Sequence, residues 1–367
     1  MARMIYHVPF PLNPQAKSGS GLRPLRMLGA FRDIGYDVEL VSGESRERSA
    51  LIKALRKRIA AGERFDFLYS ESHTMPTALT DVDHLPRHPF MDVIFLRFAR
   101  RSGIKVGLFY RDVYWRFPEY KGRVKPLLHA ATRALYNVDL LAYKAAVDTL
   151  YLPSMGMGKF VPHVPPSRHK ALPPGGEIND FPSPNKDGIH LFYVGGLGGY
   201  YNMHDCVQAV AASRNAWLTM CTREEEWAQN RLGYQELMND RIKVVHKNGA
   251  ELRPYYEQAD ICMLFIEPSI YRSFAAPLKF AEYIGFGKPV IVNDGTNVAQ
   301  FVAVHGNGWV VPFEPEGLTS LLDDLAAHPE KVAAVTATAL AIREDNTWAA
   351  RARQVAAELS PARQLPA

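Results

Sequence analysis

Lys279 and Glu282 lie one helical turn apart in a segment where a loop of small residues passes into a predicted short helix. Pro277 suits the first turn of that helix, because its missing N–H would have no helical partner there. The free backbone N–H groups of such a helix start, beside the small side chain of Ala276, can bind an anion such as a pyrophosphate. Lys279 would add a cation, and the Glu282 carboxylate could accept hydrogen bonds from two ribose hydroxyls. The same two residues could also form an ordinary surface Lys–Glu pair.

A glycine-rich stretch follows the predicted strand His190–Val194 and precedes a predicted helix, which is the context of a phosphate-binding turn. Gly196 and Gly198 could approach a phosphate closely, although a tight turn that needs positive φ explains these glycines equally well. Position 201 is tyrosine, so the spacing does not complete G-x-G-x-x-G and excludes a nicotinamide site of that type. Arg223, after the next strand, could bind a phosphate or lie in solvent.

The first half of the chain offers weaker candidates at the ends of its predicted strands. Gly19 lies in a small, flexible loop after the first strand and could approach a substrate. Glu71 and His73 follow a later strand in the same way.

Asp112 follows the predicted strand Lys105–Tyr110, and Tyr114 and Trp115 beside it have rings that could stack on a sugar. A carboxylate in this place could act as a general base toward a hydroxyl. It could equally cap a helix beside aromatic residues of the core.

Strand-like apolar runs alternate with helical runs, which favours parallel sheets built from β-α-β units. Prolines and glycines crowd between positions 161 and 184, too densely for a helix or a central strand. The sequence therefore predicts an α/β chain with two Rossmann-like domains facing a central cleft. We expect a first domain at 1–165, a Pro-rich linker at 166–186, a second domain at 187–344, and a helix with a tail at 345–367.

Composition and charge bound the class of protein. The 367 residues are 47% hydrophobic and 22% charged, which is typical of a globular chain. Three cysteines without a CxxC pair argue against a disulfide scaffold or a zinc knuckle, and the first residues contain no signal-peptide core, so a cytoplasmic location is expected. The net charge of +5 comes with basic clusters on predicted helices of the first half. These clusters are solvated helix faces or a surface for anionic lipid headgroups, and no nucleic-acid motif accompanies them.

The segment around Lys279 resembles the donor-site signature of family 4 glycosyltransferases, in which strings such as PLKxxEYxxxGKPVI recur. The matching residues are Pro277, Leu278, Lys279, Glu282, Tyr283, Gly287, Lys288, Pro289, Val290 and Ile291. The resemblance implies a GT-B fold whose last helix crosses back to the first domain. It implies a nucleotide-sugar-binding second domain and an acceptor-binding first domain. Glu282 would bind the donor ribose, and Lys279 with the Leu278 amide would face the diphosphate.

Two positions depart from the family pattern. The first glutamate of the family's Glu-x7-Glu pair would fall at position 274, which is phenylalanine here. The glycine-rich loop lacks the arginine that usually follows its first glycine, so Lys279, Arg223 or Arg272 would have to meet the phosphate charge.

The resemblance implies transfer of a sugar from a UDP- or GDP-sugar, with UDP favoured, to a glycan or lipid-linked acceptor. Such a reaction serves cell-surface polysaccharide or glycolipid synthesis at the inner face of the membrane. No metal or other cofactor is expected, because cations and a helix dipole can stabilise the leaving diphosphate. A retaining reaction is expected, with Asp112 orienting the acceptor. The alternatives are an inverting transferase with Asp112 as base, a GT-B nucleotide-sugar epimerase, and an inactive partner subunit, which Phe274 would suit.

Overall fold

The computed structural model describes residues 2–16, 18–117, 126–180, 187–198 and 201–360. It divides into two compact units, one made of Met1–Pro174 with Trp348–Ala367 and the other of Gly175–Thr347. The first crossing point, after Pro174, falls within the predicted linker. Part of that linker segment belongs to the first unit, because its residues form a sixth strand there.

The first unit is a parallel six-stranded sheet in the order β2-β1-β3-β4-β5-β6. Its strands are β1 Ala2–His7, β2 Tyr36–Val41, β3 Phe67–Glu71, β4 Lys105–Phe109, β5 Thr149–Leu152 and β6 His169–Ala171. Every residue of β3 is buried, as expected of a central strand covered on both faces. The parallel arrangement predicted from the alternating pattern is confirmed.

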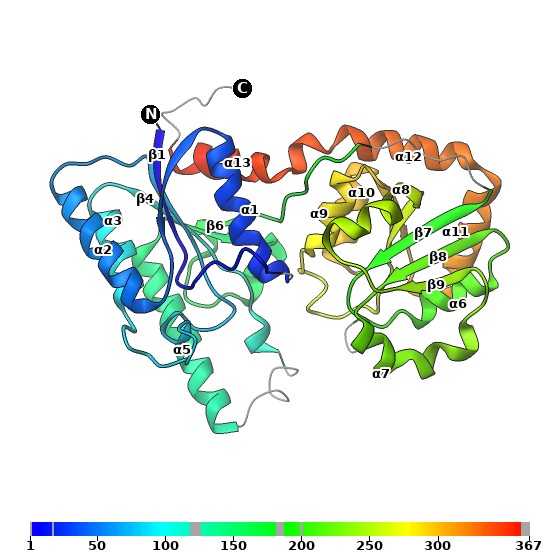
Figure 1. Ribbon diagram of the computed structural model, residues 1–367, viewed down its shortest axis with the longest axis horizontal. Coiled ribbons are helices and arrows are strands. Elements are labelled where there is room, and N and C mark those ends of the chain that lie inside the picture. Colours follow the sequence, from blue (N-terminus) through cyan, green and yellow to red (C-terminus); the bar gives the residue numbers. More distant parts are fainter. Residues whose placement is uncertain (1, 17, 118–125, 181–186, 199–200, 361–367) are drawn as a thin grey trace. The chain divides into compact units, whose positions relative to one another are not determined.

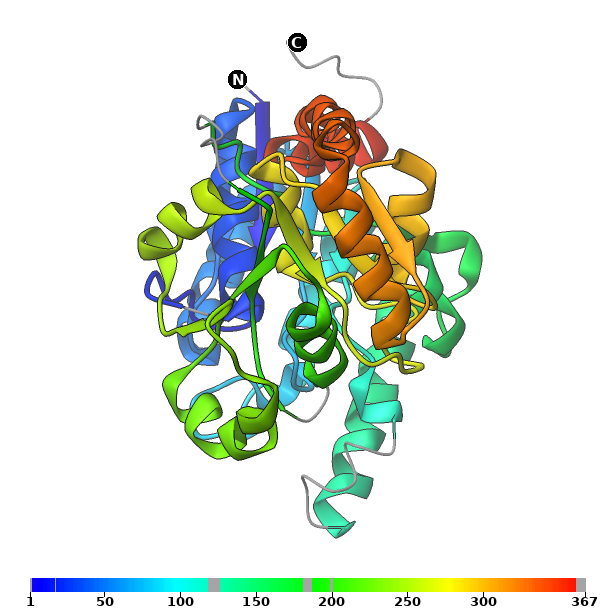
Figure 2. The same cartoon turned by 90° about the vertical axis from the view of Figure 1, so that its right-hand side faces the viewer.

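Helices cover both faces of this sheet (Figure 1). They are α1 Gly19–Asp33, α2 Ser45–Ala60, α3 Met91–Arg101, α5 Pro126–Ala146 and α13 Trp348–Leu359, with short 3-10 turns η1 Thr77–Leu79, η2 Tyr114–Arg116, η3 Met155–Phe160 and η4 Pro166–Arg168. Right-handed crossovers put α1 on one face and α2, α3 and α5 on the other. The helix α3 packs against both α2 and α5. The first turns of α5 extend beyond the rest of the unit in both views (Figures 1 and 2).

The last helix, α13, completes the first unit although it follows the second in the chain. It packs along α1 and contacts β3 and β4. Trp348, its first residue, lies near the Arg23 guanidinium, which stacks on the Phe109 ring at 3.5 Å. The prediction that the C-terminal helix returns to the first domain is confirmed.

The second unit is another parallel six-stranded sheet, in the order β12-β11-β10-β7-β8-β9. Its strands are β7 Ile189–Val194, β8 Ala216–Cys221, β9 Ile242–Val245, β10 Ile261–Leu264, β11 Val290–Asn293 and β12 Gly308–Val311. Its helices are α6 His204–Ala212, α7 Glu224–Tyr234, α8 Arg253–Gln258, α9 Leu278–Gly285, α10 Asn297–His305, α11 Pro315–Ala327 and α12 Pro329–Ala341, with 3-10 turns η5 Gln235–Leu237, η6 Gly249–Leu252 and η7 Glu344–Asn346.

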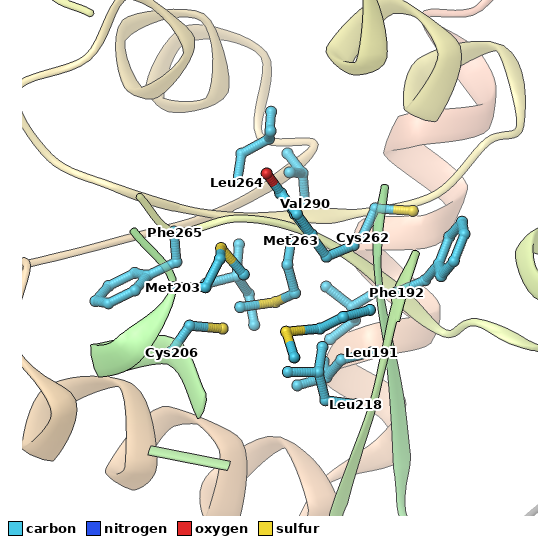
Figure 3. Packing of buried hydrophobic residues seen from close by; sticks show 14 of the residues in the cluster. Leu191, Phe192, Met203, Cys206, Leu218, Cys262, Met263, Leu264, Phe265 and Val290 are labelled. Atoms are coloured by element: carbon cyan, nitrogen blue, oxygen red, sulfur yellow. The ribbon is translucent and has the colours of Figure 1, made fainter. Parts of the chain in front are cut away.

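The core of the second unit is built from side chains of the central strands and of α6. Figure 3 shows Met203 and Cys206 on one side of Met263, and Leu191 and Leu218 on the other. All three cysteines of the chain are free and buried, as expected of small core residues.

Two glycines bring backbone segments into contact near the point where the chain enters the second unit. The Gly176 N–H donates to the Asn346 carbonyl at 2.8 Å, so the entering and leaving segments are hydrogen-bonded to each other. A Cβ at Gly285, within α9, would collide with the Glu177 carbonyl. The helix α9 is thereby held against the entering segment.

We expect Gly285→Ala to destabilise the second unit by about 1–3 kcal/mol, because the added methyl group overlaps a backbone carbonyl that cannot turn away. Gly29→Ala in α1 is the control, since a Cβ there meets open space and alanine favours a helix by about 1 kcal/mol. Thermal unfolding should therefore shift in opposite directions for the two variants. A stabilised Gly285→Ala protein would show that this close contact is not required.

Candidate functional site

The candidate site lies where the strand order of the second sheet reverses. Its first strand, β7, has β8 and β9 on one side and β10, β11 and β12 on the other. Because β10 is paired directly with β7, the loops that follow β7 and β10 leave adjacent strand ends in opposite directions. Such a switch point at the carboxyl ends of parallel strands is the usual ligand position in an open α/β sheet. The loop after β7 carries the glycines, and the loop after β10 leads to α9.

The glycines of the loop after β7 are required for different structural reasons. Gly198 has φ of +89°, and a Cβ there would press on the Asn230 side chain, so the tight-turn interpretation holds for it. Gly196 accepts a hydrogen bond from the Tyr193 hydroxyl through its carbonyl at 2.7 Å. A Cβ at Gly195 would collide with the Lys279 ammonium. This last glycine was not singled out from the sequence, and it is the one that admits the lysine.

Lys279 reaches the glycine loop from the first turn of α9. Its Nζ lies 4.8 Å from the centre of the Tyr193 ring and 4.9 Å from that of Tyr201. The nitrogen is buried, and no residue that the structure describes accepts a hydrogen bond from it. Burial, with the nearby charge of Arg272, lowers the Lys279 pKa to about 7. A buried ammonium that lies over two aromatic rings and has no hydrogen-bond acceptor among the described residues is suited to bind an anion.

The start of α9 adds backbone donors to this cation. Pro277 precedes the helix and supplies no side-chain cap, whereas Thr296 caps the neighbouring α10 by accepting from the Ala299 N–H at 3.0 Å. The first N–H groups of α9, after the small Ala276, thus have no capping side chain. A small pocket lies beside them at the ends of β10 and β11, lined by Leu264, Ile266, Arg272, Ala275, Pro277, Asn293, Thr296 and Val298.

Arg272 completes the cluster from the loop after β10. Its guanidinium stacks on the Tyr201 ring at 4.7 Å, on the tyrosine that also covers Lys279. Tyr201 and Tyr193 are residues that the sequence interpretation missed as site residues. The available signal was an aromatic residue at each end of the glycine-rich stretch.

Glu282 and Arg223 differ in how they relate to this cluster. Glu282 is half-buried on α9, one turn beyond Lys279, and its charge partly offsets the lowering of the lysine pKa. Arg223 is largely exposed and pairs with Glu226 at 2.7 Å, as its solvated interpretation predicted. The same Glu226 accepts from the Leu197 N–H at 2.9 Å. Arg223 therefore acts on the glycine loop only through this carboxylate.

The candidates of the first unit are fixed by internal contacts. Asp112 accepts from the Tyr114 N–H at 2.9 Å, which ties its carboxylate to the first residue of η2, although the N-cap position itself is Val113. Trp115 is 2% exposed, stacks on Tyr136 at 5.0 Å and donates to the Tyr110 hydroxyl. The prediction that Trp115 faces an acceptor is therefore wrong, because no face of its indole is free.

Tyr114 and Gly19 remain near the carboxyl edge of the first sheet. The Tyr114 hydroxyl donates to the Thr74 carbonyl at 3.3 Å, and its residue is half-buried. Gly19 is exposed at the start of α1, which Ser18 caps by accepting from the Gly21 N–H.

The chain contains one D-x-D string, Asp81-Val82-Asp83, whereas the sequence interpretation that expects no metal took the chain to lack such a string. Asp81 accepts from the Ser45 N–H at 2.7 Å, and Asp83 pairs with Arg87. Both carboxylates are thus engaged by protein groups. Within the described ranges, no group of three or more His, Cys, Asp and Glu residues is placed to hold a metal ion.

The chain is similar to known proteins in part of its sequence and in its fold. Residues 188–328 match the family model described as glycosyl transferases group 1. No curated protein sequence is significantly similar to the chain. Solved structures similar in fold include HepE from Anabaena in complex with UDP, at 14% identity and a TM-score of 0.66, covering 98% of this chain and 100% of that one.

Two further solved structures have the same fold. Sucrose-phosphate synthase from Thermosynechococcus elongatus has 14% identity and a TM-score of 0.63, covering 96% of this chain and 97% of that one. WaaG, a glycosyltransferase involved in lipopolysaccharide biosynthesis, has 16% identity and a TM-score of 0.58, covering 97% and 99%. These likenesses show the GT-B fold.

We expect Lys279→Met to stabilise the unliganded second unit by about 1–3 kcal/mol at pH 6, because it removes a buried ammonium without an acceptor. The folded pKa of about 7 lies below the ordinary lysine value of 10.5. The wild type therefore regains stability as the pH rises from about 7 toward 10.5, and the advantage of the variant should shrink over that range. Unfolding at pH 6 and pH 9.5 measures this. A variant that is destabilised equally at both values would contradict the assignment.

Proposed function

We propose that this chain is a glycosyltransferase that transfers a sugar from a UDP-sugar to a glycan or lipid-linked acceptor, a proposal that the match of residues 188–328 to the model of glycosyl transferases group 1 supports. The observation that carries the donor half of the proposal is the buried Lys279 ammonium at the switch point of the second sheet. The choice of UDP is supported by HepE, which shares the fold and is described in complex with UDP and with UDP-glucose.

In this proposal the second unit stabilises the leaving nucleoside diphosphate. The diphosphate gains negative charge as its bond to the sugar breaks, so fixed positive groups lower the barrier more than they tighten ground-state binding. Lys279 and the uncapped N–H groups at Leu278 and beyond supply those groups, with Arg272 beside them. Glu282 accepts hydrogen bonds from the ribose hydroxyls and so orients the nucleotide.

Phe274 affects how the donor sugar would be bound, not how the diphosphate would be bound. It is 2% exposed and packs edge-on against Tyr271 with ring centres 5.1 Å apart. A buried ring at the position of the family's first glutamate cannot accept hydrogen bonds from a sugar hydroxyl. The sugar would therefore be held by other groups of the loop, and an inactive partner subunit is the alternative that this residue favours.

Retention of the anomeric configuration is part of the proposal. The Asp112 carboxylate is held in place by the Tyr114 N–H, which suits a residue that orients an acceptor hydroxyl. An inverting reaction with Asp112 as general base is the alternative. The anomeric configuration of the product, determined by NMR, distinguishes the two.

We expect UDP or a UDP-sugar to stabilise the protein by about 2.7 kcal/mol at 100 times its dissociation constant. Glu282→Ala should weaken binding by about 1–3 kcal/mol, because the ribose hydroxyls lose their acceptor. Glu257→Ala, which removes an exposed carboxylate paired with Arg253 on α8, should bind like the wild type. A thermal-shift series with UDP, GDP, ADP and their sugars measures this. No shift with any nucleotide would favour the inactive partner subunit.

A lipid-linked acceptor would bring the first unit to the inner face of the cytoplasmic membrane, and the surface of α3 suits such contact. Phe90 and Ile94 are 57% and 53% exposed, and Arg97 and Arg101 follow on the same helical face, also exposed. Exposed apolar groups beside cations are typical of a surface that binds anionic lipid.

The neighbouring helix α5 continues this surface. Val138 and Leu141 are 43% and 52% exposed there, with Arg133 and Lys144 exposed on the same helix. Among the described residues, no helix is long and apolar enough to cross a bilayer. We therefore propose peripheral binding through the exposed faces of α3 and α5.

We expect the protein to sediment with vesicles that contain phosphatidylglycerol and much less with pure phosphatidylcholine. Replacing Phe90 and Ile94 by serine should weaken vesicle binding roughly 10-fold, since two apolar groups are lost from the contact. The control is Val304→Ser, on the exposed face of α10 in the second unit. Equal sedimentation of the wild type and the double variant, or no dependence on lipid charge, would exclude this surface.

A further inference from the structure

His73 lies two residues beyond the end of β3, at the carboxyl edge of the first sheet, and the proposed mechanism does not use it. Its Nδ1 lies 3.1 Å from the Met75 backbone nitrogen, which donates to it. In the neutral ring the proton must then be on Nε2. The Phe10 ring packs edge-on at 4.6 Å and fixes the plane of the imidazole.

The ring is kept neutral by its surroundings. Burial, with the positive charge of Arg111 and a smaller contribution from His84, lowers the His73 pKa to about 4. A neutral ring of one tautomer presents a single N–H donor in a fixed direction. No hydrogen bond from Nε2 to a described residue is present, and the residue is half-buried rather than enclosed.

Each guanidinium nitrogen of Arg111 already donates to a protein oxygen, so this arginine does not make the edge an anion site. Its guanidinium donates to Glu71 at 3.0 Å, to the Ser20 carbonyl at 2.7 Å and to the Ser72 carbonyl at 3.1 Å. Glu71 is fully buried. Arg23, which also pairs with Glu71, is only 4% exposed. Among the described residues, a phosphate would therefore find no accessible, unengaged cation at this edge, whereas an uncharged hydroxyl oxygen needs only a neutral donor.

His73 and Asp112 follow directly on two residues that are bonded to each other. The Arg111 N–H donates to the Ser72 hydroxyl at 3.1 Å, across the paired ends of β3 and β4. His73, which follows Ser72, offers its Nε2–H as a donor, and Asp112, which follows Arg111, offers a carboxylate. A sugar hydroxyl both donates and accepts one hydrogen bond, so this pair matches its requirements.

We infer that the His73 Nε2–H donates a hydrogen bond to a hydroxyl of an uncharged sugar acceptor in the first unit. The inference rests on the proposed glycosyl transfer for its reaction, although the binding of the sugar itself does not require turnover. His73 is thereby a residue that binds the acceptor and takes no proton in the reaction.

Two variants separate this role from the structural role of the ring. In His73→Asn the side-chain oxygen takes the place of Nδ1 and can still accept from the Met75 N–H, but the Nε2 donor is lost. In His73→Gln the side-chain amide nitrogen takes the place of Nε2. We expect both variants to retain UDP affinity and thermal stability near those of the wild type. The acceptor KM should rise roughly 10-fold in His73→Asn and recover in His73→Gln, as loss of one hydrogen bond predicts.

A binding measurement gives the same answer without turnover. In the full chain with 15N-labelled histidine, long-range NMR spectra should show His73 as the neutral Nε2–H tautomer. Octyl β-glucoside and octyl β-galactoside, used as uncharged probes below their micelle concentrations, should shift that signal, and UDP alone should not. The inference is overturned if neither glycoside shifts the signal, if UDP alone does, or if His73→Asn binds the glycosides like the wild type. A glycoside shift without any transfer would instead count against the proposed function alone.

Discussion

The burial of one ammonium group determines much of the second unit's site. Lys279 can occupy its position only because residue 195 has no side chain. Among the described residues its nitrogen has no hydrogen-bond acceptor, and its charge is compensated by the rings of Tyr193 and Tyr201 and partly by the carboxylates of Glu282 and Glu226. Desolvating a cation without an acceptor costs free energy, which a bound anion returns when it restores the missing interaction. The glycine loop, Tyr193 and Tyr201 are therefore parts of one arrangement, and a change in any of them alters the environment of the same nitrogen.

The two units differ in how their buried charged groups are paired. In the second unit a cation is left without a hydrogen-bond acceptor among the described residues, whereas in the first the charges are matched internally. Glu71 pairs with both Arg111 and Arg23, at 3.0 and 3.3 Å, and Asp92 is shared between His7 and Arg48 at 2.9 and 3.0 Å in a buried network. The arrangement in the second unit suits an ionic ligand that brings its own charge. The arrangement in the first unit suits a neutral ligand, which single hydrogen bonds can orient.

The sequence predicts most of the fold because the parallel strands are continuous apolar runs separated by helical periods, and because Pro277 and Gly287 mark the ends of α9. It also predicts Lys279, since that residue lies in a long motif. It does not distinguish Trp115 in the core from a ring facing a ligand, because aromatic residues serve both roles and only packing decides between them. The same limit applies to the tyrosines around the ammonium, whose contacts join residues far apart in the chain. The short strand β6 was missed because its three residues lie among prolines.

The chain leaves the first unit after Pro174 and returns only at Trp348, so that unit is discontinuous in sequence. During synthesis on the ribosome, the second unit is complete before the helix that covers α1 has been made. Until then the nascent chain exposes the apolar side of α1 and leaves the Arg23 guanidinium without the nearby indole. The unit that contains the N-terminus is therefore the last to be completed during synthesis. A transcript that lacks its last codons would yield a completed second unit joined to an incomplete first unit.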